Sequence, residues 1–263
     1  MTFLYEPGLK TMIDAIHKFI GTRLFGEAKY NRSRYKRAKR IAQRFGYEVY
    51  KPQLIWLEDE DYLNAKAEAA ARGIIGIPND RCYVLLDLAR TTRGIKGDIA
   101  ECGVRHGKSS LFILSGLGPG NNRKFDIFDS FEGLSEPGSS DRDESGDTVW
   151  VLGELAVQEQ TVLNNLRGFD TRIELHKGWI PDRFDDVRDS QFAFVHVDVD
   201  LYEPTRDSFA FFYPRMSKGG VMICDDYGSA YCPGAKKAVD EFFATKSERV
   251  ISLPTGQSLV IKE

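Results

Sequence analysis

Acidic residues follow several of the short apolar runs in this chain. They are Glu101, Asp129, Asp198 with Asp200, and Asp225 with Asp226. In open α/β sheets, ligands bind beyond the carboxyl ends of the strands, so acids at that edge favour a binding site. Any one of these acids alone could equally be a helix cap or a turn residue. The complete set is harder to explain in that way, and it predicts a polar site at one rim of a sheet.

The run Phe-Ala-Phe-Val-His-Val-Asp-Val-Asp indicates what such a site could bind. Side chains alternate across a strand, so Asp198 and Asp200 start on the same side, roughly 6.6 Å apart. Neighbouring carboxylates repel each other unless a proton or a cation lies between them. With Asp225 and Asp226 on the next strand, this oxygen-rich set suits Mg²⁺, Ca²⁺ or Mn²⁺ rather than zinc or copper. His196 is more typical of a core or supporting histidine than of a ligand.

A glycine-containing turn, Glu-Cys-Gly-Val-Arg-His-Gly-Lys-Ser-Ser, follows the first predicted strand. A phosphate-binding loop needs four residues between its glycines, whereas Gly103 and Gly107 enclose three. The sequence Gly107-Lys108-Ser109 is therefore a weak signal for a phosphate site. The other interpretation is a nucleoside-binding turn, in which Asp129 at the end of the next strand accepts the ribose hydroxyls. The dinucleotide pattern GxGxxG is absent, and spacing by itself leaves both interpretations open.

The elements that must position these residues change character along the chain. Up to about residue 95 the patterns are helical; beyond it, short apolar runs alternate with helical patterns, which is typical of β-α-β units and a parallel sheet. Strands are predicted near 98–103, 125–129, 172–176, 192–198 and 220–224, with a last pair near 249–252 and 258–261. Helices are predicted at about 30–45, 58–72, 108–117, 151–167, 204–213 and 233–245, with a further one from Asn79 or Asp80 to Gly94. The acidic segment 132–147 is predicted to be a mobile surface loop that closes over a bound acceptor.

Five ordered motifs carry a resemblance to a known family. They are Gly97-Asp-Ile-Ala-Glu-Cys-Gly-Val-Arg-His-Gly107, Asp129-Ser-Phe-Glu-Gly-Leu134, Lys177-Gly-Trp179, Asp198-Val-Asp-Leu-Tyr-Glu203 and Cys224-Asp-Asp-Tyr227. Together they resemble the macrocin O-methyltransferase family, S-adenosylmethionine-dependent enzymes that methylate sugar hydroxyls of natural products with a divalent metal. The resemblance runs from about Asn79 to Phe243. It implies a doubly wound, mostly parallel α/β sheet, the Rossmann-like fold of class I methyltransferases, with a helical N-terminal extension.

The resemblance also implies residues that bind the cofactor, S-adenosylmethionine. These are Glu101, Gly103, Gly107, Ser109, Asp129, Ser130, Gly178 and Trp179. Within this set, Asp129 and Ser130 match the ribose and adenosine contacts. Gly178 and Trp179 match the position that bounds the adenine.

The remaining motifs imply the metal site and the catalytic pair. Asp198, Asp225 and Asp226 resemble ligands of Mg²⁺, or of Mn²⁺ or Ca²⁺ in its place. Asp200 resembles the general base, so Asp198 and Asp200 are the expected catalytic residues. A divalent metal would stabilise the deprotonated form of an acceptor hydroxyl, and a vicinal diol could chelate it through both oxygens. The expected acceptor is therefore a sugar or polyol diol, in a small molecule or a glycan.

Two positions depart from the pattern of the family. Lys108 stands where the family often has a second glycine, and it is expected to alter the loop or to contact an anionic group. Val199 stands where the family often has glycine between the two acids, and the strand is therefore expected to continue further before it turns.

The predicted organisation has two parts. Residues 1–78 form a helical N-terminal extension that supplies the acceptor pocket or oligomer contacts, and residues 79–263 form the domain that binds S-adenosylmethionine. The precedent of the family implies a homo-oligomer.

Composition and charge narrow the remaining function classes. The 263 residues contain 36 Lys and Arg against 39 Asp and Glu, and the net charge of −3 makes no global case for binding nucleic acid or a membrane. No apolar run reaches the length of a bilayer span, and the N-terminus lacks the apolar core of a signal peptide. The four cysteines show neither a CxxC pair nor zinc-ligand spacing, which favours reduced thiols and a cytoplasmic location.

The sequence leaves three other functions open. A phosphate-loop NTPase would use the segment 192–198 as its metal-binding strand. A metal-dependent glycosyltransferase would use Asp198-Val199-Asp200 to hold a sugar nucleotide. A non-catalytic interpretation gives the basic segment 29–44 the main role, docking to nucleic acid or to an anionic membrane. The same segment could instead be a solvated helix face or a subunit contact.

Overall fold

The computed structural model describes residues 58–169 and 171–263, together with 26–46 and positions 16, 19–21, 23, 24 and 56. The chain divides into two compact units, residues 1–57 and 58–263. The first unit contains helix α2 (Glu27–Arg44), as predicted. Within the predicted extension 1–78, residues 1–15, 17, 18, 22, 25, 47–55 and 57 lie outside the described residues, and a division at residue 79 stays a prediction.

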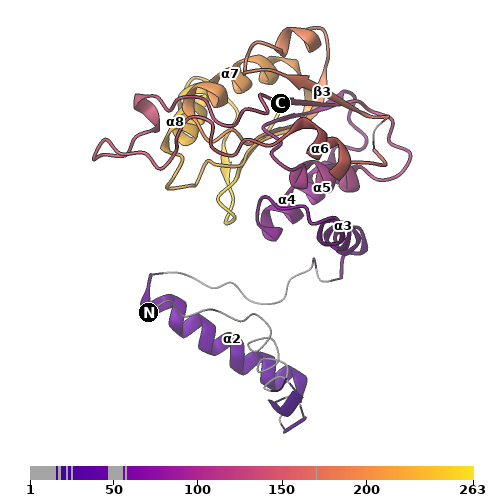
Figure 1. Ribbon diagram of the computed structural model, residues 1–263, viewed down its shortest axis with the longest axis vertical. Coiled ribbons are helices and arrows are strands. Elements are labelled where there is room, and N and C mark those ends of the chain that lie inside the picture. The colour runs from indigo at the N-terminus through magenta and orange to yellow at the C-terminus, as the bar shows by residue number, and fades with distance from the viewer. Residues whose placement is uncertain are drawn as a thin grey trace. The chain divides into compact units, whose positions relative to one another are not determined.

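The second unit is built on a seven-stranded sheet in the order β3-β2-β1-β4-β5-β7-β6. Figure 1 labels its edge strand β3 and the helices α3 to α8 around it. Its strands are β1 (Asp98–Cys102), β2 (Phe125–Asp129), β3 (Ile173–Lys177), β4 (Phe192–Val197), β5 (Met216–Cys224), β6 (Ile251–Ser252) and β7 (Ser258–Ile261). Strands β1 to β5 run parallel, whereas β7 pairs antiparallel with β5 and with β6. This order confirms the predicted doubly wound, mostly parallel fold. The chain order reverses between β1 and β4, which is where such sheets bind ligands.

Helices cover both faces of this sheet. They are α3 (Glu60–Ala71), α4 (Asn79–Thr91), α5 (Lys108–Leu117), α6 (Glu159–Asn165), α7 (Tyr202–Phe212) and α8 (Pro233–Phe243). Helices α3 and α4 pack on α5, whereas α7 packs on α8. The apolar cluster beneath α7 and α8 contains Ala100, Phe128, Val195 and Met222 from four different strands. No helix in the described part of the chain has both the length and the apolarity needed to cross a bilayer.

The central strand β4 is buried along its whole length, as the continuous apolar run of a strand covered on both faces requires. Its register places His196 beside Glu101 of β1 and beside Ile223 of β5. The single polar side chain of β4 therefore lies inside the sheet, directly below the carboxyl edge.

Two predicted elements differ from the structure. The helix predicted at 151–167 is confined to α6, because Gly153 and Leu155 adopt left-handed backbone angles and residue 134 exchanges backbone hydrogen bonds with residues 153 and 154. Strand β4 ends at Val197, one residue before its predicted end at 198, and it does not continue further as valine at position 199 implies. Val199 packs into the core, and Asp200 turns the chain with a positive φ of 57°.

Candidate active site

A cavity of about 520 Å³ opens at the carboxyl ends of the central strands. Nine of the residues that the sequence nominates line it: Gly103, Ser109, Asp129, Ser130, Trp179, Asp198, Asp200, Asp225 and Asp226. Parallel strands end at the same rim, so acids that are far apart in the chain converge there. The other three nominated residues, Glu101, Gly107 and Gly178, do not line this cavity.

The loop between β1 and α5 forms one wall of the cavity, and its glycines are required by the backbone. Gly103 has a φ of 82°, and a Cβ atom there would overlap the carbonyl oxygen of Asp198. Gly107 has a φ of 78°, and it precedes the first residue of α5. Ser109, in the first turn of α5, lines the cavity although it is almost completely buried. The loop therefore brings the N-terminus of α5, with its positive dipole, to the ligand space.

The turn after β2 holds Asp129 at the next position along the rim. Its carboxylate accepts the backbone N–H of Val104 at 2.8 Å and that of Phe131 at 2.7 Å. The Ser130 hydroxyl accepts the N–H of Glu132 at 3.0 Å and donates to the carbonyl of Gly133 at 2.9 Å. Both side chains are thus oriented before any ligand binds, with Asp129 facing the cavity as a hydrogen-bond acceptor.

Glu101 lies beneath the cavity in a buried network. Its fully buried carboxylate accepts hydrogen bonds from the Ser110 hydroxyl and from Nδ1 of His196, the latter at 2.8 Å. Nε2 of His196 lies 3.4 Å from an oxygen of Asp225. Burial lowers the pKa of His196, but Asp225 and Glu101 outweigh this and raise it to about 10. The imidazolium therefore joins two buried carboxylates, and the structure gives Glu101 a supporting position instead of a place on the cavity wall.

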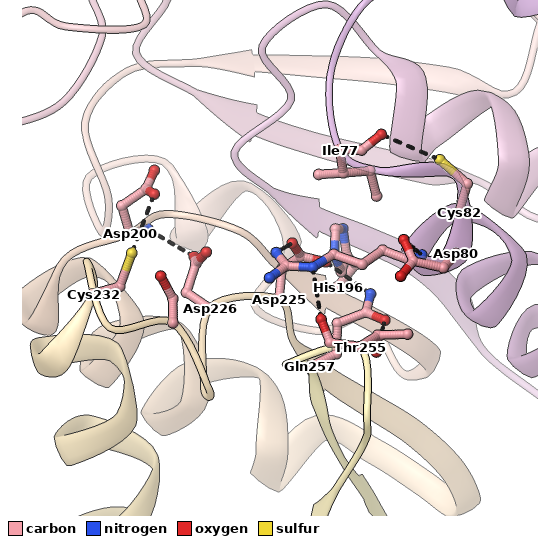
Figure 2. A network of polar contacts seen from close by, with 12 residues as sticks. Ile77, Asp80, Cys82, His196, Asp200, Asp225, Asp226, Cys232, Thr255 and Gln257 are labelled. Carbon is pink, nitrogen blue, oxygen red and sulfur yellow. Dashed lines mark hydrogen bonds and ion pairs between the residues drawn. The ribbon is translucent and has the colours of Figure 1, made fainter. Parts of the chain in front are cut away.

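Asp225 has two further partners, of which Gln257 is labelled beside it in Figure 2. The guanidinium of Arg81, from α4, forms an ion pair with it, and Nε2 of Gln257 donates to it at 2.8 Å. Arg81 is itself held by the carbonyl of Thr255 at 3.1 Å. Burial alone would raise the pKa of Asp225, but His196, Arg81 and Gln257 lower it. No local pattern in the sequence points to Arg81, because its partner lies 144 positions away in the chain.

Asp200 and Asp226 lie together beside Cys232 (Figure 2). Asp226 accepts the N–H of Asp200 at 3.1 Å, and the Cys232 thiol donates to the Asp200 carboxylate at 3.6 Å. Burial, together with the charge of Asp225, raises the pKa of Asp200 to about 6, although the thiol opposes the shift. Burial and the charges of Asp200 and Asp225 hold the pKa of Asp226 well above its usual range.

Asp200, Asp226 and Cys232 form one group of side chains whose ligand atoms lie close together. Asp198 forms another such group with His196 and Asp225. Burial and the charges of Asp225 and Asp226 hold the pKa of Asp198 well above its usual range. The four predicted carboxylates thus form two adjacent groups instead of one. Each group also contains one other donor, the His196 imidazole or the Cys232 thiol. The mutual repulsion of the four carboxylates, and their oxygen atoms, fit a hard divalent cation.

Lys108 has a different role from the expected contact with an anion. Its ammonium donates to the carbonyl of Ile77 at 2.7 Å and to the side chain of Asn79 at 3.2 Å. Ile77 itself lines the cavity. Lys108 therefore fastens the segment before α4 to the N-terminus of α5 and builds part of the cavity wall.

The acidic segment 132–147 is anchored at its centre. Asp141 is buried and accepts the N–H groups of Gly138 at 2.8 Å and of Tyr202 at 2.6 Å. This fastens the segment to the first residue of α7. The predicted closure over an acceptor stays a prediction.

Comparisons with known proteins identify relatives. Residues 75–254 match the family model described as Macrocin-O-methyltransferase (TylF). The demethyldecarbamoylnovobiocin O-methyltransferase of Streptomyces niveus is 33% identical over 159 residues, which is 57% of this chain and 59% of that protein. A tetracenomycin-C 4'-O-methyltransferase of Streptomyces olivaceus, named for its 2,3-dimethoxy-rhamnosyl substrate, is 33% identical over 151 residues, which is 54% of this chain and 57% of that protein. The chain thus spans less than two thirds of the length of these curated relatives.

Solved structures show the same fold. The O-methyltransferase NovP superposes with a TM-score of 0.59 at 28% identity, over 71% of this chain and 81% of that one. The calicheamicin methyltransferase CalS11 gives a TM-score of 0.61 at 18% identity, over 81% of this chain and 94% of that one. The structural likeness therefore extends over most of the chain.

Proposed function

Because the chain belongs to the macrocin O-methyltransferase family, we propose that it transfers the methyl group of S-adenosylmethionine to a hydroxyl of a sugar or polyol. One observation carries this proposal: a single cavity is lined both by the Asp129 turn, which suits a nucleoside, and by the carboxylates of Asp198, Asp200 and Asp226. A methyl donor and a hydroxyl acceptor could therefore lie side by side in it. The name of the Streptomyces olivaceus relative, which includes a rhamnosyl group, supports this acceptor class.

The donor half of the cavity is assigned to the first two strand ends and to Trp179. Asp129 would accept the ribose hydroxyls, with Ser130 beside it, and Trp179 would bound the adenine. Gly103 and Ser109 would border the methionine part, near the N-terminus of α5. Glu101 and Gly107 would support this loop from below, and Gly178 would shape the turn that presents Trp179.

The acceptor half is assigned to the carboxylates. Asp198, Asp225 and Asp226 would hold a divalent cation such as Mg²⁺, Mn²⁺ or Ca²⁺, because their mutual repulsion favours a bound positive charge. Such an ion, when bound, stabilises negative charge that develops on a hydroxyl oxygen. Asp200 would accept the proton of that hydroxyl. The oxygen–methyl bond then forms as the sulfur–methyl bond breaks, and the sulfonium leaves as a neutral thioether.

Position contributes as much as activation in this scheme. A well-oriented pair of reactants gains an effective molarity of about 10⁵–10⁸ M. A vicinal diol fits the cation best, because two oxygens can bind it at once. The proposed acceptor is therefore a sugar or polyol diol. The proposal also includes a cytoplasmic location and a homo-oligomeric state. The four cysteines, all free and buried, support the location.

Calorimetric titration with S-adenosylmethionine tests the proposal. The native chain should bind it, and Asp129→Ala should weaken binding at least ~10-fold, because a hydrogen bond to a charged acceptor is lost. Asp207→Ala is the matched control, since Asp207 lines the same cavity from α7 and its loss should leave donor binding unchanged. A chain that binds a nucleoside triphosphate or a sugar nucleotide in place of S-adenosylmethionine would contradict the proposal.

A second titration addresses the metal. Exhaustive chelation should abolish methyl transfer to a panel of glycosides, and added Mg²⁺ should restore it. Asp226→Asn should weaken Mn²⁺ binding, measured by electron paramagnetic resonance, while S-adenosylmethionine still binds. Full activity after chelation would remove the metal from the proposal and leave the donor site intact.

A further inference from the structure

Helix α2 concentrates positive charge in a chain that is otherwise acidic. Its 18 residues carry eight Lys or Arg side chains and a single acid, Glu27, whereas the whole chain has a net charge of −3. The basic residues are Lys29, Arg32, Arg34, Lys36, Arg37, Lys39, Arg40 and Arg44. The proposed methyl transfer uses none of them, because every residue that lines the cavity lies between Ile75 and Asp226.

The same helix has an apolar stripe. Ala38, Ile41, Ala42 and Phe45 follow one another at spacings of three and four residues, so they share one side of the helix. Ile41 is 50% exposed and Phe45 is 73% exposed. Most of the basic residues fall on the other side at 100° per residue. The helix is therefore amphipathic, with a cationic face and an apolar stripe that is open to solvent.

A second exposed apolar stripe lies in the same unit. Ile16, Ile20 and Leu24 recur every four residues, and each is about half exposed or more. A Cβ atom at Gly21 would overlap the ring of Tyr30, so this segment packs closely against α2. Among the described residues of this unit, the exposed apolar side chains thus come from two segments that touch.

We propose that α2 binds the surface of an anionic lipid bilayer. A helix with Lys and Arg on one face and large apolar side chains on the other lies in the plane of a membrane interface, with its apolar face in the headgroup region. Long basic side chains can extend from such a position to the lipid phosphates. The cytoplasmic leaflet carries the negative surface potential that attracts them.

The features of α2 favour this occupant over two others. Nucleic acid would complement the charge, but phosphate contacts make no use of Ile41 and Phe45. A second α2 would cover the apolar stripe, but it would leave the cationic face, on the other side of the helix, without a complementary charge. An anionic bilayer complements both faces at once. The binding does not depend on the proposed methyltransferase activity.

Flotation of the full chain with lipid vesicles tests this inference. The chain should float with phosphatidylcholine vesicles that contain phosphatidylserine, should not float with phosphatidylcholine alone, and should be released by salt. Combined Arg37→Gln, Arg40→Gln and Arg44→Gln should weaken partitioning about 100-fold. Combined Ile41→Ser and Phe45→Ser should weaken it at least ~10-fold.

The matched control removes the same charge elsewhere. Lys177→Gln, Arg188→Gln and Lys218→Gln change three exposed basic residues of the second unit, and they should leave flotation unchanged. Circular dichroism and titration with S-adenosylmethionine check that each variant keeps its fold.

Three results would overturn the inference. The native chain could fail to float with vesicles that contain phosphatidylserine. Duplex nucleic acid could bind the native chain, with an affinity that falls in the charge variant and is unchanged in the apolar variant. Sedimentation could show that Ile41→Ser with Phe45→Ser splits an oligomer that never bound vesicles, in which case the stripe is a contact between copies.

Discussion

Asp225 lines the cavity and also belongs to the buried polar network beneath it. Arg81, His196 and Gln257 all donate to it, and the imidazolium passes the interaction on to Glu101. Two buried carboxylates and two cations alternate in this network, so the desolvated charges compensate one another. Removing one member of such a network typically costs about 3–5 kcal/mol, because its partner is left buried and unpaired.

Arg81→Gln should tighten the binding of Mn²⁺. The guanidinium competes for Asp225 and adds a positive charge beside Asp226 and Asp198, so its loss leaves the carboxylates more attractive to a cation. We expect at least a ~10-fold fall in the dissociation constant, measured by electron paramagnetic resonance without any substrate. Arg105→Gln, which removes another cation from the cavity wall, should have a smaller effect. Weaker Mn²⁺ binding in Arg81→Gln would instead mean that Arg81 holds Asp225 in place for the metal.

At the scale of elements, close contacts between strand ends position the site. The end of β1 passes so close to the residue after β4 that only glycine fits at position 103. This contact places the loop between β1 and α5 beside Asp198. The same glycine is therefore needed for the packing of the strand ends and for the shape of the cavity wall.

Gly103→Ala should therefore be severely destabilising. The added methyl group overlaps a backbone oxygen, and the φ of 82° adds strain, so a loss of about 3 kcal/mol or more in unfolding free energy is expected. Gly146→Ala is the control, because Gly146 has a φ of 84° but nothing within 4 Å of its Cβ position. It should cost only about 1 kcal/mol, the conformational part. Equal losses in urea denaturation would contradict the steric explanation.

His176 links β2, β3 and the segment 184–187, and this link should depend on pH. Its ring lies 2.9 Å from Asp126 and 3.0 Å from Asp186. Burial lowers the pKa of His176, but the two carboxylates outweigh burial and raise it above its ordinary value of 6.5. A raised pKa means that the stabilisation is complete below about pH 6.5 and is lost as pH rises through the folded-state pKa.

The measurement compares the native chain with His176→Asn. The difference in their unfolding free energy should be larger at acid than at alkaline pH within the folded range, because only the protonated ring gains from the two carboxylates. A difference that is constant from below pH 6.5 to well above it would show that protonated His176 contributes nothing.

At the scale of the whole molecule, the second unit holds the entire sheet and the cavity. Its core runs through β1, β2, β4, β5 and β7 and includes α7 and α8. Each residue that lines the cavity also belongs to this unit.

Residues 58–263 should therefore fold without the first unit. Thermal unfolding should remain a single cooperative transition, and the affinity for S-adenosylmethionine should equal that of the full chain. Vesicle binding should be lost in the same fragment, because α2 is absent. A fragment that is unfolded by circular dichroism would show that the first unit contributes to the core.

Local patterns in the sequence were sufficient for the strands and for the family. The apolar run of β4 and the acids after β1, β2, β4 and β5 predict a parallel sheet with a polar rim, because parallel strands end on one edge. The ordered motifs predict membership of the macrocin O-methyltransferase family, and the family match confirms it. The shortened helix α6 and the early end of β4 were not predicted, because backbone contacts made elsewhere in the fold decide them.

Only the tertiary structure decided which side chains meet at that rim. Arg81 reaches Asp225 because α4 packs beside the sheet, and Glu101 turns inward because β1 lies against His196. Lys108 supports the cavity wall because the carbonyl of Ile77 accepts a hydrogen bond from its ammonium. Residue type and spacing describe what a side chain can do, whereas its partner depends on helix packing and strand order, which bring together positions that no local pattern connects.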